Sequence, residues 1–240
     1  MAAKKGTLYL IPTTMGESKP EWVIPATVLA TSRRLKHFIA ENERSARRYL
    51  KAIGTEHPLD DLKFYILDKR SKAIDVPDLI APLLQGTDMG LISEAGLPAI
   101  ADPGSLAVAA CHRNKIKVVP CTGPSSIVLG LIASGFNGQE FSFHGYLPHN
   151  KKDRLHKLRT LENEVRRSGA TQIFMETPFR NESLFEDMMN HCSPGLEICV
   201  ATDITLQTEV ITTRTVDEWI KHPPKIDKRP CMFLMGISGM

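Results

Sequence analysis

Short apolar runs rich in β-branched and aromatic residues alternate with segments of helical period along the first half of the chain. The runs span residues 7–12, 36–41, 62–67, 89–93 and 116–120. Helical period is clearest between them at 75–85 and 104–114. A strand, a helix and a further strand, repeated in this order, predict a parallel sheet with helices on both faces.

The segment 43–53 is the most informative of the expected helices. One side carries four residues at spacings of three and four, which we expect to pack: Ala46, Tyr49, Leu50 and Ile53. The opposite side carries four cations: Arg44, Arg47, Arg48 and Lys51. On pattern alone a solvated helix face is the favoured interpretation of such a stripe, and a nucleic-acid surface is the alternative.

The pattern of residue types changes after residue 120. The turn Cys121-Thr122-Gly123-Pro124-Ser125-Ser126 precedes the run 127–133, which is apolar on nearly every side. We expect that run to be a helix buried all round, at the seam of two lobes. The expected domains are an N-terminal α/β lobe, 1–121, and a C-terminal α/β lobe, 122–240.

The second half predicts five more strands and three more helices. The strands are expected at 141–145, 172–176, 196–202, 209–213 and 231–236, and the helices at 151–167, 182–191 and 215–221. The link between 196–202 and 209–213 is too short for a crossover helix, so the second sheet should be mixed.

Composition excludes several classes of protein. With 42% hydrophobic and 24% charged residues the chain has a globular balance, and its net charge of +3 permits an RNA substrate without arguing for one. No apolar run reaches membrane-spanning length, and the N-terminal stretch is too short for a signal peptide, so we expect a cytoplasmic protein without a membrane segment. The five scattered cysteines predict reduced thiols, and no metal site is expected.

The chemistry should lie just after the strands of the first half, because open parallel sheets bind ligands beyond the carboxyl ends of their strands. The first strand leads into Pro12-Thr13-Thr14-Met15-Gly16, and the fourth leads into a long loop from Ser93 to Gly104. Neither the dinucleotide fingerprint G-x-G-x-x-G after the first strand nor the phosphate loop G-x-x-x-x-G-K-[ST] is present. These loops suit a nucleoside without phosphate, and S-adenosylmethionine is such a ligand.

Five segments, in order, carry a family resemblance. They read GTLYLIPTTMG, LISEAGLPAIADPG, VVPCTGPSSIVLGLIASG, FHGYLP and IFMETPFR. They resemble the ribosomal RNA small-subunit ribose 2'-O-methyltransferases of the tetrapyrrole methylase superfamily, over about residues 6–236. The resemblance implies two α/β lobes with S-adenosylmethionine in a cleft between them, usually within a homodimer.

The same resemblance implies a set of site residues. The cofactor would be contacted by eight: Pro12, Glu94, Leu97, Ser126, Ile127, Met175, Ala201 and Met232. Glu41 or Glu176 would take the proton of the acceptor hydroxyl, and Arg44 would orient it. Phosphates of ribosomal RNA or the small ribosomal subunit would meet a set of cations: Arg44, Arg47, Arg48, Lys151, Lys152 and Arg154.

The chain departs from the family pattern at four places, and the one after the second strand bears on the substrate. There Glu41-Asn42-Glu43-Arg44 stands where the family typically has E-D-T-R. Elsewhere Ser93-Glu94 stands in place of S-D, Ala101-Asp102-Pro103-Gly104 in place of S-D-P-G, and Gly16-Glu17 in place of Gly-Asn. Two other functions therefore stay open. One is the same fold and cofactor acting on a small, porphyrinoid-like acceptor, and the other is a ribosome-associated binding module without turnover.

Overall fold

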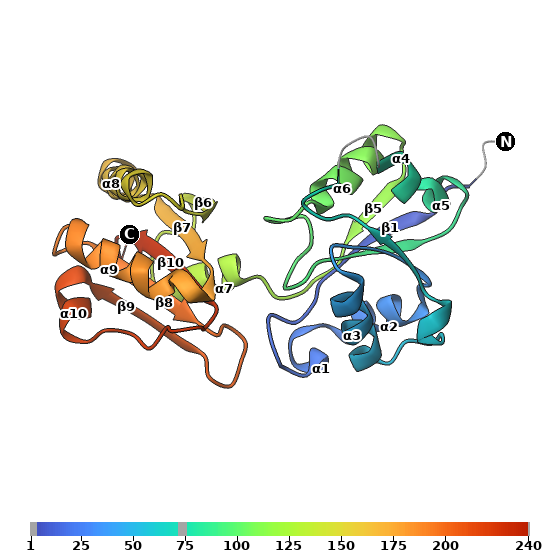
Figure 1. Ribbon diagram of the computed structural model, residues 1–240, viewed down its shortest axis with the longest axis horizontal. Helices are drawn as coiled ribbons and strands as arrows, with labels where there is room; N and C mark the ends of the chain where they lie inside the picture. The colour runs from blue at the N-terminus through green and yellow to red at the C-terminus, as the bar shows by residue number, and fades with distance from the viewer. Residues whose placement is uncertain (1–3, 72–75, 240) are drawn as a thin grey trace. The chain divides into compact units, whose positions relative to one another are not determined.

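The computed structural model describes residues 4–71 and 76–239. By its internal contacts the chain forms two compact units, Met1–Ser125 and Ser126–Met240, each with its own sheet (Figure 1). The boundary expected between Cys121 and Thr122 stays a prediction for independently folding domains. No helix of the described part is long and apolar enough to cross a membrane.

The sheet of the first unit is parallel throughout, as the alternating pattern predicts. Its strands are β1 (Thr7–Ile11), β2 (His37–Ala40), β3 (Lys63–Ile66), β4 (Met89–Ile92) and β5 (Lys117–Pro120), in the order β3-β2-β4-β1-β5. Its helices are α1 (Pro20–Val23), α2 (Ala26–Arg34), α3 (Glu43–Ile53), the 3-10 turn η1 (Leu59–Asp61), α4 (Val76–Leu79), α5 (Ala81–Leu84) and α6 (Gly104–Arg113).

Helices cover both faces of this sheet. On one face α2 and α3 pack against Ile11, Phe38 and Ile92. On the other, α4, α5 and α6 pack against a second set that includes Leu8 and Leu91. Because neighbouring residues of a strand point to opposite faces, each buried strand supplies both layers, which accounts for the near-continuous apolar runs.

Helix α3 has the expected bounds and the expected buried side. Its four buried residues are Ala46, Tyr49, Leu50 and Ile53. The Asn42 side chain accepts hydrogen bonds from the amides of Arg44 and Ser45, which caps the first turn. Gly54 ends the helix at φ 76°, a left-handed conformation that glycine adopts without strain.

The second unit has the mixed sheet that its short links predict. Its strands are β6 (Phe141–Tyr146), β7 (Thr171–Glu176), β8 (Glu197–Thr202), β9 (Val210–Thr215) and β10 (Cys231–Gly236), in the order β6-β7-β10-β8-β9. Only β6 and β7 run parallel to each other. Its helices are α7 (Ser126–Ser134), α8 (Lys151–Ser168), the 3-10 turn η3 (Pro178–Arg180), α9 (Asn181–His191) and α10 (Val216–Lys221).

The helices of this unit divide between the two faces of its sheet. Residues of α8, α9 and α10 share one core with Phe174, Val200 and Phe233. Helix α7 lies on the opposite face, where a Cβ added at Gly130 would come within 4 Å of Ala201 and Leu234.

One sequence-based expectation is wrong. The helix expected at 75–85 is two short helices, α4 and α5, because Pro82 has no amide hydrogen to continue the helical bonding; residue 75 lies outside the described residues. Within its own unit, helix α7 buries the side that carries Gly130, Leu131 and Ser134, and Val128 and Ile132 lie outside that core. Burial of α7 on all sides at the seam of two lobes stays a prediction.

Candidate active site

The carboxyl ends of β1, β2 and β4 form the candidate site of the first unit. The chain after β1 and β2 leads to α2 and α3 on one face of the sheet, and the chain after β4 leads to α6 on the other. Strand β4 lies between β1 and β2. The chain therefore leaves β4 toward one face of the sheet and leaves both neighbouring strands toward the other face. Such switch points are where open α/β sheets bind ligands.

The loops after β1, β4 and β5 contact one another at this edge. The Thr13 amide donates a 2.9 Å hydrogen bond to the Gly96 carbonyl, and the Thr13 hydroxyl donates to the Ser93 carbonyl over 3.4 Å. The turn after β5 closes on the same place, because an added Cβ at Gly123 would lie 2.2 Å from the Cβ of Pro12. Glycine at 123 is therefore required for the close approach to Pro12.

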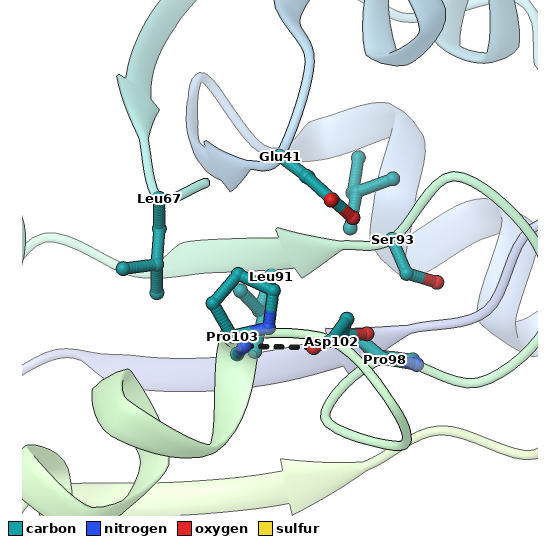
Figure 2. Close-up of a pocket in the computed structure, with 9 residues that line it drawn as sticks. Glu41, Leu67, Leu91, Ser93, Pro98, Asp102 and Pro103 are labelled. Carbon is teal, nitrogen blue, oxygen red and sulfur yellow. Dashed lines mark hydrogen bonds between the residues drawn. The ribbon is translucent and has the colours of Figure 1, made fainter. Parts of the chain in front are cut away.

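The Asp102 carboxylate organises the loop between Ser93 and Gly104. It accepts hydrogen bonds from the Ala99 amide, at 2.9 and 3.0 Å. It also accepts one from the Gly104 amide at 2.7 Å (Figure 2). The loop holds Ala99 and Ala101 at φ values of 66° and 59°, a left-handed backbone that alanine rarely adopts. Backbone strain of this kind is concentrated at functional sites.

A small hollow lies between the loop after β4 and the residues that follow β2 and β3. It measures about 190 Å³, open space included, and Glu41, Ser93 and Asp102 are among its lining residues (Figure 2). Burial raises the pKa of the Glu41 carboxyl, and the nearby charges of Glu94 and Asp102 raise it further. Burial likewise raises the pKa of Asp102 against the opposing effect of its two amide donors. Partly desolvated carboxyl groups make this edge of the sheet suited to a cation.

Ser45 joins the second-strand segment to the fourth-strand loop. Its hydroxyl lies 3.0 Å from the Asn42 carbonyl and 3.1 Å from Oε1 of Glu94, and it can donate to either. Ser45, which directly follows the segment that departs from E-D-T-R, thus contacts the proposed cofactor residue Glu94. Sequence reasoning singled out Glu94 and the loop but missed Ser45 and Thr13, whose contacts join segments far apart in the chain.

Three of the candidate cofactor residues of the second unit lie in one row across its sheet. Met232 of β10 is paired in register with Met175 of β7 on one side and with Ala201 of β8 on the other. Ala201 faces α7, and cross-strand neighbours share a face, so the row lies on the α7 side of the sheet. Ser126 and Ile127 begin α7. The structure therefore gathers these five residues around one helix.

Glu176, the second candidate base, is already paired. Its side chain is 1% exposed and forms a short ion pair with Nη2 of Arg180, and its other oxygen accepts a 2.7 Å bond from the Thr177 amide. Both carboxylate oxygens of Glu176 are therefore already engaged by neighbouring donors. Glu41 is therefore the better placed of the two candidate bases.

Ion pairs separate the candidate phosphate-binding cations into two groups. Arg47 contacts Glu43 at 2.7 Å and the Leu59 carbonyl at 2.6 Å, and its guanidinium lies 4.8 Å from the centre of the Phe64 ring. Arg154 was expected at the surface, but it is buried and pairs with Asp187 at 2.6 Å. The expected phosphate contact at Arg154 is therefore wrong, because its guanidinium satisfies a buried carboxylate.

The other cations remain accessible. Lys151 has a side chain that is 68% exposed and lies 3.4 Å from Asp187. Arg44, Arg48 and Lys152 are exposed, and within residues 4–71 and 76–239 they have no ion-pair partner.

The described part of the chain holds neither a metal cluster nor a disulfide at these sites. Within the described ranges no group of three or more His, Cys, Asp or Glu residues is arranged to hold a metal ion. All five cysteines are free thiols, and four of them are buried, as their scattered positions predict.

Comparison with solved structures defines the class of protein. No protein-family model matches the chain. The crystal structure of the methyltransferase CobJ superposes with a TM-score of 0.62 and 16% identity, covering 98% of this chain and 94% of that one. Uroporphyrin-III-C-methyltransferase from Thermus thermophilus gives a TM-score of 0.53 and 16% identity, covering 96% and 92%. The fold is that of the tetrapyrrole methylases.

Comparison with curated proteins then gives the family. Ribosomal RNA small subunit methyltransferase I of Haemophilus influenzae is 31% identical over 233 residues, covering 96% of this chain and 78% of that protein. The protein of the same name from Vibrio cholerae is 30% identical over 222 residues, covering 92% and 73%. The chain belongs to this family of S-adenosylmethionine-dependent methyltransferases.

Proposed function

We propose that the protein transfers a methyl group from S-adenosylmethionine to a ribose 2'-hydroxyl of small-subunit ribosomal RNA. The observation that carries this proposal is the 31% identity to a ribosomal RNA small subunit methyltransferase over 96% of the chain. The ordered segments that resemble ribose 2'-O-methyltransferases, from GTLYLIPTTMG to IFMETPFR, support the ribose hydroxyl as the acceptor.

The donor chemistry of the site fits the cofactor. S-adenosylmethionine carries a positive sulfonium and an amino group, and Glu41, Glu94 and Asp102 supply carboxyl oxygens at one edge of the first sheet. We propose that three residues of the first unit contact it: Pro12, Glu94 and Leu97. Five residues of the second unit would do the same: Ser126, Ile127, Met175, Ala201 and Met232.

Glu41 is the proposed proton acceptor. When bound, the cofactor would supply an activated methyl group to the ribose oxygen and leave as the neutral thioether. The hydroxyl proton then passes to Glu41, whose raised pKa makes it a stronger base than an ordinary carboxylate. Arg44, in the first turn of α3, is the proposed cation that orients the acceptor. Glu176 stays a weaker candidate because Arg180 holds it.

The accessible cations are the proposed contacts to RNA phosphates. Arg44 and Arg48 on α3, and Lys151 and Lys152 on α8, keep this role, whereas the ion pair with Glu43 makes Arg47 the weaker candidate. We further propose that the protein is a cytoplasmic homodimer. The exposed apolar side of α7, with Ile132 at 71%, supports self-association.

Transfer of a labelled methyl group tests the function. Purified protein, labelled S-adenosylmethionine and small ribosomal subunits should give label in RNA, and nuclease digestion should release it as a 2'-O-methylated nucleoside. Label found on a base, or found only on a porphyrinoid offered in the same assay, would overturn the proposal. Uptake of cofactor without transfer to any acceptor would favour a binding module instead.

A further inference from the structure

Two exposed aromatic residues lie at one edge of the second sheet. Tyr146 ends β6 and is 53% exposed, and Phe179 lies in η3, just beyond β7, and is 82% exposed. Strands β6 and β7 are parallel neighbours, so the segments that follow them leave the sheet at the same edge (Figure 1). Exposed apolar side chains that gather at one place mark interaction surfaces, whereas single ones are ordinary.

Polar contacts hold the two segments together. Nη1 of Arg180 makes a short contact with Nδ1 of His149, which joins η3 to the loop after β6. Arg154 donates a 2.9 Å hydrogen bond to the His149 carbonyl from beneath, and its guanidinium is fixed by buried Asp187. The segments that carry Tyr146 and Phe179 are therefore held together by polar contacts.

Two acidic side chains of this edge are buried beneath basic ones. The acids Glu176 and Asp187 have side chains only 1% and 4% exposed, and each is covered by a cation. Lys151 and Lys152 begin α8 at the surface, and Lys151 is 68% exposed. A partner approaching this edge meets Lys151, Lys152 and the aromatic rings, with the exposed acids Asp153 and Glu182 in the first turns of α8 and α9, while Glu176 and Asp187 lie below them.

We propose that this edge, defined by Tyr146, His149, Lys152 and Phe179, binds single-stranded RNA beside the methyl acceptor. Aromatic rings stack on bases of any sequence, and cations alongside them track the phosphates. Tyr146 is paired in register with Met175, a proposed cofactor residue, so nucleotides held here would lie next to the reacting one. This inference rests on the proposed function. It adds that the bound RNA is single-stranded and names the surface that binds it.

Binding of a short fluorescein-labelled single-stranded RNA, followed by anisotropy, tests the surface. Phe179→Ala should weaken binding by about fivefold to a hundredfold, the range measured for loss of one stacked base. Phe179→Trp should bind as wild type does or more tightly, and Phe179→Leu should be as weak as the alanine variant because it keeps apolar bulk but cannot stack. Lys152→Gln should lower the slope of log affinity against log salt by about 0.7.

Phe141→Ala is the matched control, because Phe141 is an exposed aromatic at the opposite end of β6. The surface is disproved if Phe179→Leu binds RNA as wild type does, or if Phe141→Ala weakens binding equally. It is also disproved if Phe179→Ala changes only self-association in sedimentation. Methyl transfer to RNA separates the two proposals. If Phe179→Ala transfers methyl as wild type does, the surface alone is excluded. If wild type transfers none, the proposed function is excluded.

Discussion

The hydroxyl of Ser45 lies 3.1 Å from Oε1 of Glu94, which joins the start of α3 to the loop after β4. Glu94 in turn is one of the charges that raise the pKa of Glu41. The segment that departs from the family pattern is therefore connected, through two side chains, to the proposed cofactor loop.

The pH dependence of methyl transfer should follow Glu41. Because its pKa is raised, the acidic limb of the rate profile should lie above the pH of an ordinary carboxyl group. Glu94→Gln removes a negative neighbour and should move that limb to lower pH at saturating cofactor. Glu41→Gln should lower kcat by about 10²–10⁴. A limb that stays in place in both variants would exclude Glu41 as the base.

The stability of the same Glu41→Gln variant should change in the opposite sense to its activity. A carboxyl whose folded pKa is raised binds its proton more tightly in the folded state, so its unfavourable contribution appears as pH rises through the folded pKa. At neutral pH Glu41→Gln should therefore unfold at a higher urea concentration than wild type, and at low pH the two should coincide. Equal midpoints at neutral pH would contradict the raised pKa.

Replacement of Gly123 by alanine should disrupt the loop junction at Pro12. The added Cβ would lie 2.2 Å from the Pro12 Cβ, and relieving such overlap costs about 1–3 kcal/mol. Thermal unfolding should show a lower Tm, and the affinity for S-adenosylhomocysteine should fall. Gly195→Ala is the control, because nothing lies within 4 Å of an added Cβ there. An unchanged Tm for Gly123→Ala would refute the close approach.

The ion pair of Arg154 and Asp187 should be critical for the stability of the second unit. Asp187→Asn leaves a buried guanidinium unpaired, which typically costs about 3–5 kcal/mol. Urea denaturation should therefore show a large loss, whereas Glu164→Gln, which breaks the exposed pair with Arg167, should leave the midpoint almost unchanged. A loss in Asp187→Asn no larger than in Glu164→Gln would contradict the burial of this pair.

Arg47 and Arg48 are adjacent on α3 but should respond differently to replacement by glutamine. Arg48→Gln should raise the KM for RNA and reduce its salt dependence, because Arg48 is exposed and lacks an ion-pair partner among residues 4–71 and 76–239. Arg47→Gln should lower the unfolding midpoint, since it removes contacts to Glu43, Leu59 and Phe64. Equal effects of the two variants on KM would show that the stripe acts as a whole.

Local pattern was sufficient for much of the fold. The bounds of α3 and β10, and the buried side of α3, follow directly from the spacing of apolar residues. The break at Pro82 was readable in principle, since proline removes an amide, but the apolar period continues across it. The exposed side of α7 was not readable, because apolar character on every side does not say which side meets the sheet.

The site was less accessible to sequence reasoning than the fold. The loops after β1 and β4 were found because the ends of parallel strands share an edge, and the row of Met175, Met232 and Ala201 came from family resemblance. The partners of individual charges were not predictable. Asp187 lies 33 residues from Arg154 in sequence, so no helical spacing signals the ion pair that removes Arg154 from the surface.

Calorimetric titration of S-adenosylhomocysteine tests the assigned cofactor site most directly. Wild type should release heat as it binds the ligand at a saturable site. Ser126→Trp, at the start of α7, should abolish that heat but still show a cooperative thermal unfolding transition. Ser142→Trp, on exposed β6, should bind as wild type does. Absence of heat in wild type, or equal affinity in the folded Ser126→Trp variant, would contradict the assignment.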